Sequence, residues 1–400
     1  MHKRQIRPIS DSEDRGFGLY IHWPFCLSKC PYCDFNSHVS QEIDIPRWHD
    51  ALLSELAVMA EFYDQHFDKR QPLSSIFFGG GTPSLMPPSI MEALITSAET
   101  LFGTISDIEI TAEANPTSVE TAKLADFKSA GINRVSMGVQ ALDDEALGFL
   151  GRGHSAQEAI TAMEKARTLF DRLSIDLIYG RTGQSQTAWR AELSQALSFG
   201  LDHLSLYQLT IEQGTQFYTR HKAGETLAVP DDEMAGLYEI TEEMTSQNGL
   251  FNYEVSNYAT QGAQSRHNLT YWRTGDWLGI GPGAYGRLTT KKGRVETMMR
   301  RSPAGWLDQV RAQSHGIDKR QIDDKAALYE EIMMMGLRLA EGVPLSRLRT
   351  LCDFADWPFE KQAVSSFIDA GWMIITDDVM RLTLDGRLRL NFILQELLAD

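Results

Sequence analysis

Three of the four cysteines in this 400-residue chain lie within one short segment, YIHWPFCLSKCPYCDFNSH. Cys26, Cys30 and Cys33 have the spacing C-x3-C-x2-C. Clustered cysteines are typical of metal sites, whereas a disulfide framework scatters cysteines among distant loops. Three thiolates can hold three irons of a [4Fe–4S] cubane and leave the fourth iron open to an exogenous ligand. The segment therefore predicts an iron–sulfur cluster with one open coordination position.

His38 bears on the identity of this metal, and Cys352 is the one cysteine outside the motif. His38 follows the cysteines closely, and three cysteines with one histidine form a known tetrahedral zinc set, so zinc is the competing metal. Zinc fingers usually place their ligands in two separated pairs, however, and this cluster directly follows an expected strand, which favours the cubane. Cys352 stands alone in LRTLCDFADW, where we expect a buried structural thiol.

Six short runs rich in β-branched and aromatic residues alternate with amphipathic helical patterns such as 46–66, 89–102 and 187–200. Strands alternating with helices, at a spacing of roughly 30 residues, predict βαβ units and a parallel sheet, either open or closed into an incomplete barrel. The expected strands are FGLYIHW (17–23), SIFF (75–78), DIEITAEA (107–114), NRVSMGVQ (133–140), LSIDLIYG (173–180) and HLSLYQLTI (203–211).

Polar and small residues stand where these strands end. Gly79–Gly81 follows the second run, Glu113 and Gln140 end the third and fourth, and Asp176 falls late in the fifth. Ligand sites of parallel α/β proteins lie at the carboxyl ends of the strands. A single carboxylate there can instead cap the next helix. Several of them at one edge, beside a cysteine cluster, favour a site.

The remaining sequence forms two further regions. From residue 214 the pattern is irregular and contains NYEVSNYA (252–259), HNLTYW (267–272) and LGIGPGAYG (278–286). After 325, helical patterns precede WMIITDDVMRLT, which predicts a hairpin turning at Asp377–Asp378, and a final helix, LRLNFILQELL. We therefore predict a core at 1–213, an α+β extension at 214–324 and a winged-helix-like module at 325–400.

Composition limits the partners. The chain carries 38 Lys and Arg against 54 Asp and Glu, a formal charge of −16, which opposes general affinity for nucleic acid or anionic membranes. We therefore do not infer DNA binding from the winged-helix pattern. The first residues contain no apolar run typical of a secretory signal, and no stretch approaches the roughly 18 apolar residues of a spanning helix. The expected location is the cytoplasm.

The cysteine motif after the first strand, with Tyr32 just before its last cysteine, resembles the radical-SAM signature. GGGTPS, AEANP, SMGVQ, GRGH, IDLIYG and GPGAYG are similar to motifs of the oxygen-independent coproporphyrinogen III oxidases and their relatives, the HemW-type haem chaperones. The resemblance covers nearly the whole chain, and its motifs are specific only in combination. It implies a partial (β/α)6 barrel and an open iron that chelates S-adenosylmethionine, whose reductive cleavage yields a 5′-deoxyadenosyl radical.

Matching these motifs also implies roles for individual residues. Tyr20 would contact the nucleotide, and Gly80, Gly81 and Thr82 would meet the methionine end of S-adenosylmethionine. Carboxylates suit ribose hydroxyls and a sulfonium charge, and an arginine suits a carboxylate. The other residues implied for this pocket are Glu113, Gln140, Arg152 and Asp176. The chain departs from the resemblance at Arg181–Thr182, where relatives usually carry Leu-Pro. This departure affects the expected geometry of the loop after IDLIYG and not the site.

Two functional classes remain, an oxidase and a haem carrier. The oxidases have another cysteine two residues after the third, where this chain has Phe35, and they begin with a longer segment before the motif. We therefore expect no coproporphyrinogen oxidase activity, although cleavage of S-adenosylmethionine stays open. An unknown radical reaction on another substrate is a third alternative.

HNLTYW favours the haem carrier, because it fits the H-N-x-x-Y-W motif associated with haem binding in the HemW group. His267 is the candidate axial ligand, with Asn268, Tyr271 and Trp272 shaping the pocket, since imidazole binds haem iron and aromatic rings can pack on a porphyrin. The simpler alternative is a loop histidine beside packed aromatics. The expected partners are haem, acceptor apoproteins such as respiratory enzymes, and an electron donor for the cluster.

Overall fold

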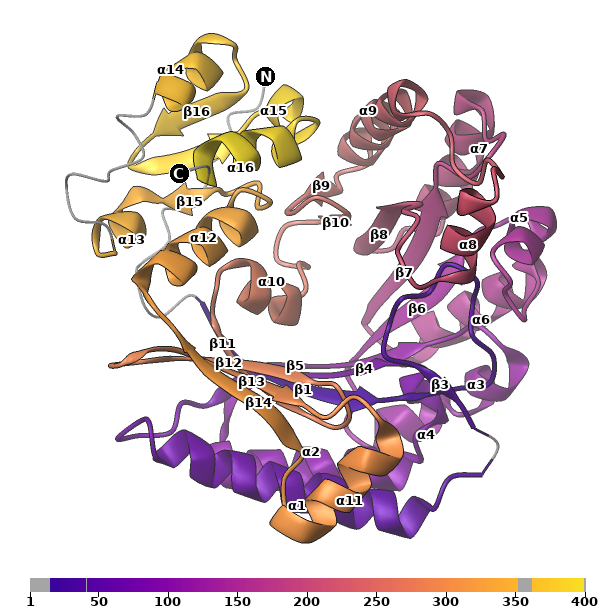
Figure 1. The fold of residues 1–400 in the computed structure, drawn as a ribbon. Coiled ribbons are helices and arrows are strands. Elements are labelled where there is room, and N and C mark those ends of the chain that lie inside the picture. Colours follow the sequence, from indigo (N-terminus) through magenta and orange to yellow (C-terminus); the bar gives the residue numbers. More distant parts are fainter. Residues whose placement is uncertain (1–14, 41, 352–361, 399–400) are drawn as a thin grey trace.

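A computed structural model describes residues 15–40, 42–351 and 362–398, so the expectation for Cys352 lies outside the described residues. One twelve-stranded sheet runs through most of this structure (Figure 1). Its strands follow the order β14-β13-β12-β11-β1-β4-β5-β6-β7-β8-β10-β9. Among the described residues, no helix has both the length and the apolar character needed to cross a membrane.

The middle of the sheet consists of the six expected strands. Each is parallel to its neighbours, in chain order from β1 to β8. The prediction of an α/β fold built as a partial (β/α)6 barrel is confirmed. The strands are β1 (Phe17–Trp23), β4 (Leu73–Gly80), β5 (Thr104–Ala114), β6 (Arg134–Gln140), β7 (Arg172–Tyr179) and β8 (His203–Gln208).

Amphipathic helices connect these strands and cover the outside of the sheet. In α1, Leu52, Leu56 and Met59 recur at helical spacing and are fully buried, so one stripe of the helix faces the core. Asp44 caps α1, and Ser155 forms a capping box with Glu158 at α6. The helices are α1 (Ile45–Asp64), α2 (Pro88–Phe102), α3 (Ser118–Ala122), α4 (Leu124–Ser129), α5 (Asp144–Phe149), α6 (Ala156–Leu169) and α7 (Gln186–Ser198).

The extension lengthens the same sheet at both edges. β11 (Asp276–Ile280) pairs with β1 in parallel, and β12 (Tyr285–Thr290), β13 (Gly293–Met299) and β14 (Ile317–Asp323) follow in antiparallel order. At the opposite edge β10 (Asn257–Ala259) joins β8, and β9 (Phe251–Asn252) joins β10. The helices of this region are α8 (Gln216–Lys222), α9 (Asp231–Gln247), α10 (Arg266–Trp272) and α11 (Pro303–Gln313).

A buried carboxyl joins this extension to the barrel. The Glu55 side chain, on α1, accepts hydrogen bonds from the backbone amides of Gly281 and Gly316, both at 2.6 Å, and from the Trp306 indole at 3.1 Å. Burial raises the pKa of Glu55 to about 7, although these donors oppose that rise. Figure 1 accordingly shows α1 and α11 side by side beneath the sheet.

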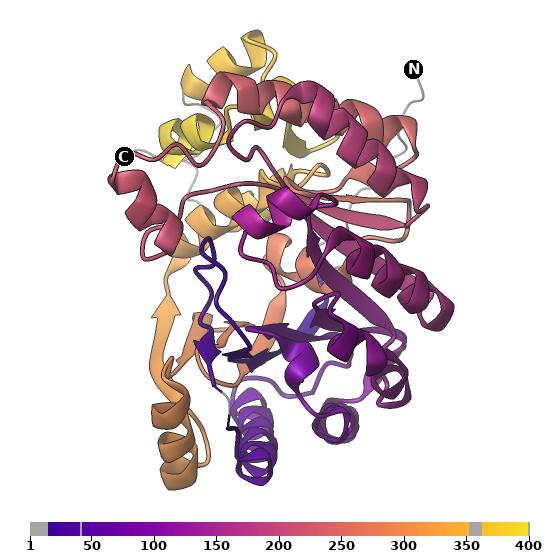
Figure 2. The same cartoon turned by 90° about the vertical axis from the view of Figure 1, so that its right-hand side faces the viewer.

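The C-terminal residues have a hydrophobic core of their own, which contains Met333, Leu348, Met380 and Ile393. The hairpin turns at Asp377 and Asp378 as predicted, and their φ angles of +53° and +62° are those of a two-residue turn that matches strand twist. Figure 2 shows β14 leading up into this module. Its elements are α12 (Lys325–Gly336), β15 (Val343–Pro344), α13 (Leu345–Arg349), α14 (Gln362–Asp369), β16 (Met373–Thr376), β17 (Val379–Leu382), α15 (Leu384–Arg387) and α16 (Leu390–Leu398).

Candidate cofactor and ligand site

The cysteine loop lies at the carboxyl end of β1. Its two ends are held together because β2 (Phe25–Cys26) pairs with β3 (His38–Val39). Cys26 is buried, Cys30 and Cys33 are partly buried, and all three thiols are free. They line one cavity of about 250 Å³. The structure therefore brings the three predicted ligands to a single pocket.

Polar groups already surround the three sulfur atoms. The Thr82 hydroxyl donates to Cys26 Sγ at 3.3 Å, and Arg152 Nη1 lies 3.3 Å from Cys30 Sγ. Burial is the main cause that raises the pKa of the Cys26 and Cys33 thiols. Bound iron would hold these sulfurs as thiolates and release their protons, so donors directed at sulfur suit the bound form.

The arrangement of the three cysteines and His38 favours an iron–sulfur cluster over zinc. Within the part of the chain that the structure describes, no group of three His, Cys, Asp or Glu residues is arranged to hold a metal ion directly. The His38 ring is instead 3.3 Å from Asn36 Oδ1, at the surface. A cubane binds one thiolate at each of three irons, so three sulfurs spread over one pocket fit a cluster.

The Gly79–Gly81 segment forms the wall beside the cysteines. Gly80 has a φ of +121°, and a Cβ there would lie 2.7 Å from the His22 ring. A Cβ on Gly81 would lie 2.7 Å from the Phe25 carbonyl oxygen. Glycine is therefore required by both backbone conformation and space. Because the two glycines have no side chains, their backbone and the Thr82 side chain line the cavity.

Four side chains from neighbouring strands and loops complete this cavity: Glu113, Gln140, Arg152 and Asp176. Gln140 ends β6 in the left-handed region, with a φ of +70°, which is uncommon for a non-glycine residue. Its Oε1 and the Arg152 Nε are buried with no hydrogen-bond partner among the described residues. Such orphaned groups are usually satisfied by a ligand or water, so they suit a polar ligand here.

Two of the side chains that line this cavity, Glu113 and Asp176, are carboxyls. Burial raises the pKa of Glu113 to about 8, with the Asp176 charge as the second cause. Burial likewise raises the pKa of Asp176, although hydrogen bonds from Ser205 and Ser136 and the charge of Arg134 oppose the rise. A cationic ligand would reverse the unfavourable burial of both charges. This pocket is therefore prepared for a ligand that carries positive charge near Glu113.

Sequence reasoning missed some wall residues, among them Asn115 and Ser136. Asn115 accepts a hydrogen bond from Arg152, and Glu120, which is almost fully buried, accepts from the Asn115 backbone amide at 2.7 Å. Asn115 lies two residues after Glu113 in the same AEANP motif, so its place in the motif was an available signal. For Ser136, strand alternation before Gln140 was the available signal.

A second, larger cavity of about 1160 Å³ adjoins the first. Phe35, Gly80 and Glu113 line both cavities and so form their common wall. The larger cavity is enclosed by β1, the segment 254–257, α10, β12 and α12. Its aromatic and methionine lining comes from Tyr20, Phe77, Tyr207, Tyr271, Trp272, Trp277, Tyr285, Met334 and Met335.

Tyr20 belongs to this larger cavity and not to the smaller one. Its hydroxyl is 3.0 Å from His22 Nδ1, and its ring stacks near Phe77 and His267. Tyr20 and His22 are two residues apart on β1 and therefore share one face of the strand. Tyr20 shares the larger cavity with Gly80 and Glu113, which line both cavities and which the resemblance also implies for S-adenosylmethionine.

His267 lines the same cavity with an almost fully buried ring. Its Nδ1 is 2.8 Å from Ser75 Oγ, and its Nε2 is 2.7 Å from the Tyr271 hydroxyl. Burial, and second the Arg134 cation, lower the pKa of His267 to about 3. The ring is therefore neutral, which is the form that ligates iron, but Tyr271 occupies its Nε2.

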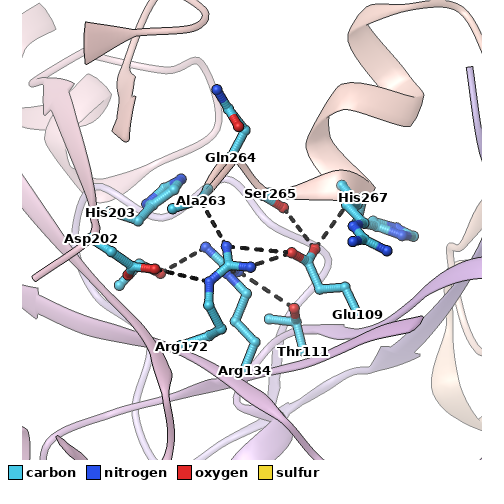
Figure 3. A network of polar contacts seen from close by, with 12 residues as sticks. Glu109, Thr111, Arg134, Arg172, Asp202, His203, Ala263, Gln264, Ser265 and His267 are labelled. Carbon is cyan, nitrogen blue, oxygen red and sulfur yellow. Dashed lines mark hydrogen bonds and ion pairs between the residues drawn. The ribbon is translucent and has the colours of Figure 1, made fainter. Parts of the chain in front are cut away.

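A buried polar network fixes the helix that carries His267 (Figure 3). Glu109 accepts from the His267 backbone amide and from the Ser265 hydroxyl, both at 3.3 Å, at the first turn of α10. Arg134 and Arg172 lie 3.9 and 3.8 Å from the Glu109 carboxylate. A carboxylate stabilises a helix N-terminus, and the two cations compensate its burial. The position of His267 is thus set from inside the barrel.

In the Arg181–Thr182 segment, which departs from the resemblance, the polar contacts of the Arg181 side chain are local. Arg181 is almost buried, and it pairs with Glu192 on α7 at 2.5 Å and donates to the Ile178 carbonyl at 2.9 Å. Gln184 also donates to Glu192, at 3.1 Å. A charged pair therefore stands in this loop, outside the residues that line either cavity.

Comparisons with known proteins agree with this geometry. The sequence matches the Radical SAM superfamily over residues 20–192 and the HemN C-terminal domain over residues 323–389. It is 36% identical to the heme chaperone HemW of Escherichia coli (strain K12) over 388 residues, which cover 96% of this chain and 98% of that protein. It is 35% identical to the mitochondrial radical S-adenosyl methionine domain-containing protein 1 of Danio rerio over 395 residues, 96% of this chain and 87% of that protein.

Among solved structures, coproporphyrinogen III oxidase (HemN) from Escherichia coli is similar in fold. It aligns with a TM-score of 0.79 and 20% sequence identity, and the alignment covers 96% of this chain and 91% of that chain. At this identity the likeness shows a common fold and does not extend to activity.

Proposed function

Because the chain belongs to the HemW family of the radical-SAM superfamily, we propose that it is a haem chaperone. In this proposal it binds a [4Fe–4S] cluster, S-adenosylmethionine and haem, and it delivers haem to acceptor proteins such as respiratory enzymes. The observation that carries the proposal is the pair of adjoining cavities, one with three cysteines and one large and aromatic. A second cavity of this size suits a tetrapyrrole, and Phe35 is the residue that favours a carrier over an oxidase.

Cys26, Cys30 and Cys33 would hold the cluster, which supplies an open iron and an electron to S-adenosylmethionine. The Gly80–Gly81 backbone would then approach the methionine end of that ligand. Its carboxylate suits Arg152, whose guanidinium is partly unsatisfied within the described residues. Its sulfonium and ribose suit Glu113 and Asp176. The Gln140 amide oxygen is a further acceptor for the nucleotide.

The larger cavity would hold haem. At about 1160 Å³ it exceeds the roughly 300–1,000 Å³ of most small-ligand sites, as a porphyrin requires. Its aromatic and methionine lining suits the face of the macrocycle. His267 is the proposed axial ligand through Nε2, and the Tyr271 hydroxyl must then leave that nitrogen. The Ser75 bond to Nδ1 would remain and would orient the ring.

The alternative is a coproporphyrinogen oxidase. Phe35 lies where the resemblance places the additional cysteine of the oxidases, and its side chain is 62% exposed on the wall common to both cavities. A phenyl ring offers neither a thiolate nor an acid–base group at that point. We therefore expect no oxidative decarboxylation of coproporphyrinogen III by the reduced, reconstituted protein.

The test is anaerobic reconstitution of the cluster followed by optical titration with haem. We expect a Soret band that saturates near one haem per chain, and transfer from the loaded protein to an apo-acceptor faster than free haem binds that acceptor. A known oxidase, reduced in parallel with the same donor, controls for inactive cluster in the decarboxylation assay. Multiple turnovers of coproporphyrinogen that disappear in Cys30→Ser would contradict the chaperone proposal.

A further inference from the structure

One face of α12 forms part of the wall of the larger cavity, while its other face belongs to the C-terminal core. Ile332, Met333 and Leu337 pack into that core. The cavity residues recur three or four positions apart, which places them on one side of the helix. They are Ala327, Glu330, Glu331, Met334, Met335 and, just after the helix, Arg338. The C-terminal module therefore supplies ligand-facing side chains.

Three arginines line this cavity, and one of them is neutralised. Arg287 contacts Glu296 at 2.6 Å, Glu331 at 3.1 Å and Asp323 at 3.6 Å. Arg301 is exposed at the rim, near the cysteine loop. With the pairs of Arg287 set aside, the carboxyls left on the wall are Glu113, Glu254 and Glu330. The cations left on this wall for an anionic ligand are therefore Arg301 and Arg338, which form no ion pair within the described residues.

Arg338 differs from the other partly buried arginines of this region. Its guanidinium lies over the Trp272 ring, 6.0 Å from the centroid, and donates to the Met334 carbonyl. Within the described residues it forms no ion pair, whereas Arg273, Arg287 and Arg294 each form at least one. Because the guanidinium is only half-buried, its remaining donors stay open to a carboxylate in the cavity. Burial accordingly lowers the pKa of Arg338, although the Glu254 charge opposes that shift.

We propose that Arg338 is the carboxylate subsite of the larger cavity, and that it binds the acidic edge of a planar apolar ligand lying against Trp272 and Met334. This inference rests on the proposed function, in which the carboxylates are the two propionates of haem. Met334 is 40% exposed and stands one helical turn before Arg338, so apolar contact and charge are adjacent on one surface. The C-terminal module then orients the ligand and does not merely cover the barrel.

The experiment compares haem with haem dimethyl ester, in which both propionates are uncharged. Wild-type protein should bind haem about tenfold more tightly than the ester, as a charge-assisted hydrogen bond implies. Arg338→Gln should bring this ratio close to one while the affinity for the ester stays unchanged. Arg338→Lys should give an intermediate ratio, because ammonium keeps the charge without the fork of donors. Arg301→Gln is the matched control at the rim and should keep the wild-type ratio.

Thermal unfolding establishes that each variant is folded before titration. A wild-type ratio in Arg338→Gln, or in Arg338→Lys if the glutamine variant does not fold, would overturn the subsite. Loss of the ratio in Arg301→Gln alone would overturn it as well, since the carboxylates would then bind at Arg301. If neither haem nor its ester binds the wild type, the proposed function itself fails, and the inference fails with it. The wild-type titration distinguishes the two failures: haem binds the wild type if only the subsite is wrong, and it does not bind if the proposed function is wrong.

Discussion

The smaller cavity is lined by residues between 26 and 176, whereas the larger one draws its wall from residues 20 to 338. The first consists mainly of glycine backbone, short polar side chains and the ends of consecutive parallel strands. The second combines aromatic side chains with charged ones, and it needs α10 and α12 as well as the barrel. One cavity is therefore a local product of strand order, and the other exists only when distant regions of the chain have assembled.

This difference has a physical consequence for ligand specificity. Groups on rigid strand ends and in a glycine-constrained loop keep their positions, so they suit a ligand whose reacting atoms must be placed accurately. A cavity closed by a separate module can change its width when that module shifts. Such a site suits a cargo that must both enter and leave. The common wall of Phe35, Gly80 and Glu113 places the two cavities side by side.

The largest effect should come from removing the cysteines of the smaller cavity. The triple change of Cys26, Cys30 and Cys33 to Ser should abolish cluster binding, against about four irons and four sulfides per wild-type chain. Haem binding should persist, because the larger cavity contains none of these residues. Iron and sulfide analysis with a parallel Soret titration measures both.

Cys352→Ser is the matched control for that variant, since it removes a cysteine outside the predicted motif. It should retain full iron and sulfide content. Stoichiometric zinc without inorganic sulfide in the wild type would contradict the cluster. Loss of haem binding together with iron would show that the two cavities cannot be occupied independently.

The sequence predicts the smaller cavity well because its residues lie in contiguous motifs at the ends of strands. Once β1 and β4–β7 are recognised, parallel order alone brings Glu113, Gln140 and Asp176 to one edge. The hairpin at Asp377–Asp378 was equally accessible, since a two-residue turn between alternating strands is a local signal. In both cases short-range geometry determines the outcome.

The larger cavity could not be predicted in this way. The side chains of a strand alternate between two faces, but sequence does not say which cavity a face meets, so sequence alone could not place Tyr20 beside His267. Arg338 and Met334 reach the cavity only because α12 packs one particular face into the C-terminal core. Such contacts depend on tertiary assembly across some three hundred residues.

An intermediate effect should come from the histidine of the larger cavity. His267→Ala should alter the Soret spectrum and weaken haem binding by about tenfold or more, while iron content and S-adenosylmethionine affinity stay unchanged. Tyr271→Phe is the matched variant, because it removes the hydroxyl that occupies Nε2. Its haem affinity should equal or exceed that of the wild type. An unchanged spectrum and affinity in His267→Ala would show that another group ligates the iron.

We expect the smallest effect at Glu113 in the common wall, as a dependence of the free energy of unfolding on pH. Burial and the Asp176 charge raise the pKa of Glu113 from 4.5 to about 8 in the folded protein. Between these two values the folded state keeps a proton that the unfolded state has lost, so Glu113 lowers stability progressively as pH rises from about 5 to 8. Glu113→Gln carries no such proton, and its stability relative to the wild type should therefore increase over that range.

Denaturant unfolding of both proteins at several pH values measures this difference. A cationic ligand should reverse it, since positive charge beside Glu113 favours the ionised form. Binding of S-adenosylmethionine to reconstituted wild type near pH 7 should accordingly release up to one proton, and binding to Glu113→Gln should release less. Calorimetry in two buffers of different ionisation enthalpy counts these protons. Equal proton release by the two proteins would mean that the sulfonium binds away from Glu113. The ligand of the smaller cavity would then not reach the wall that the two cavities share.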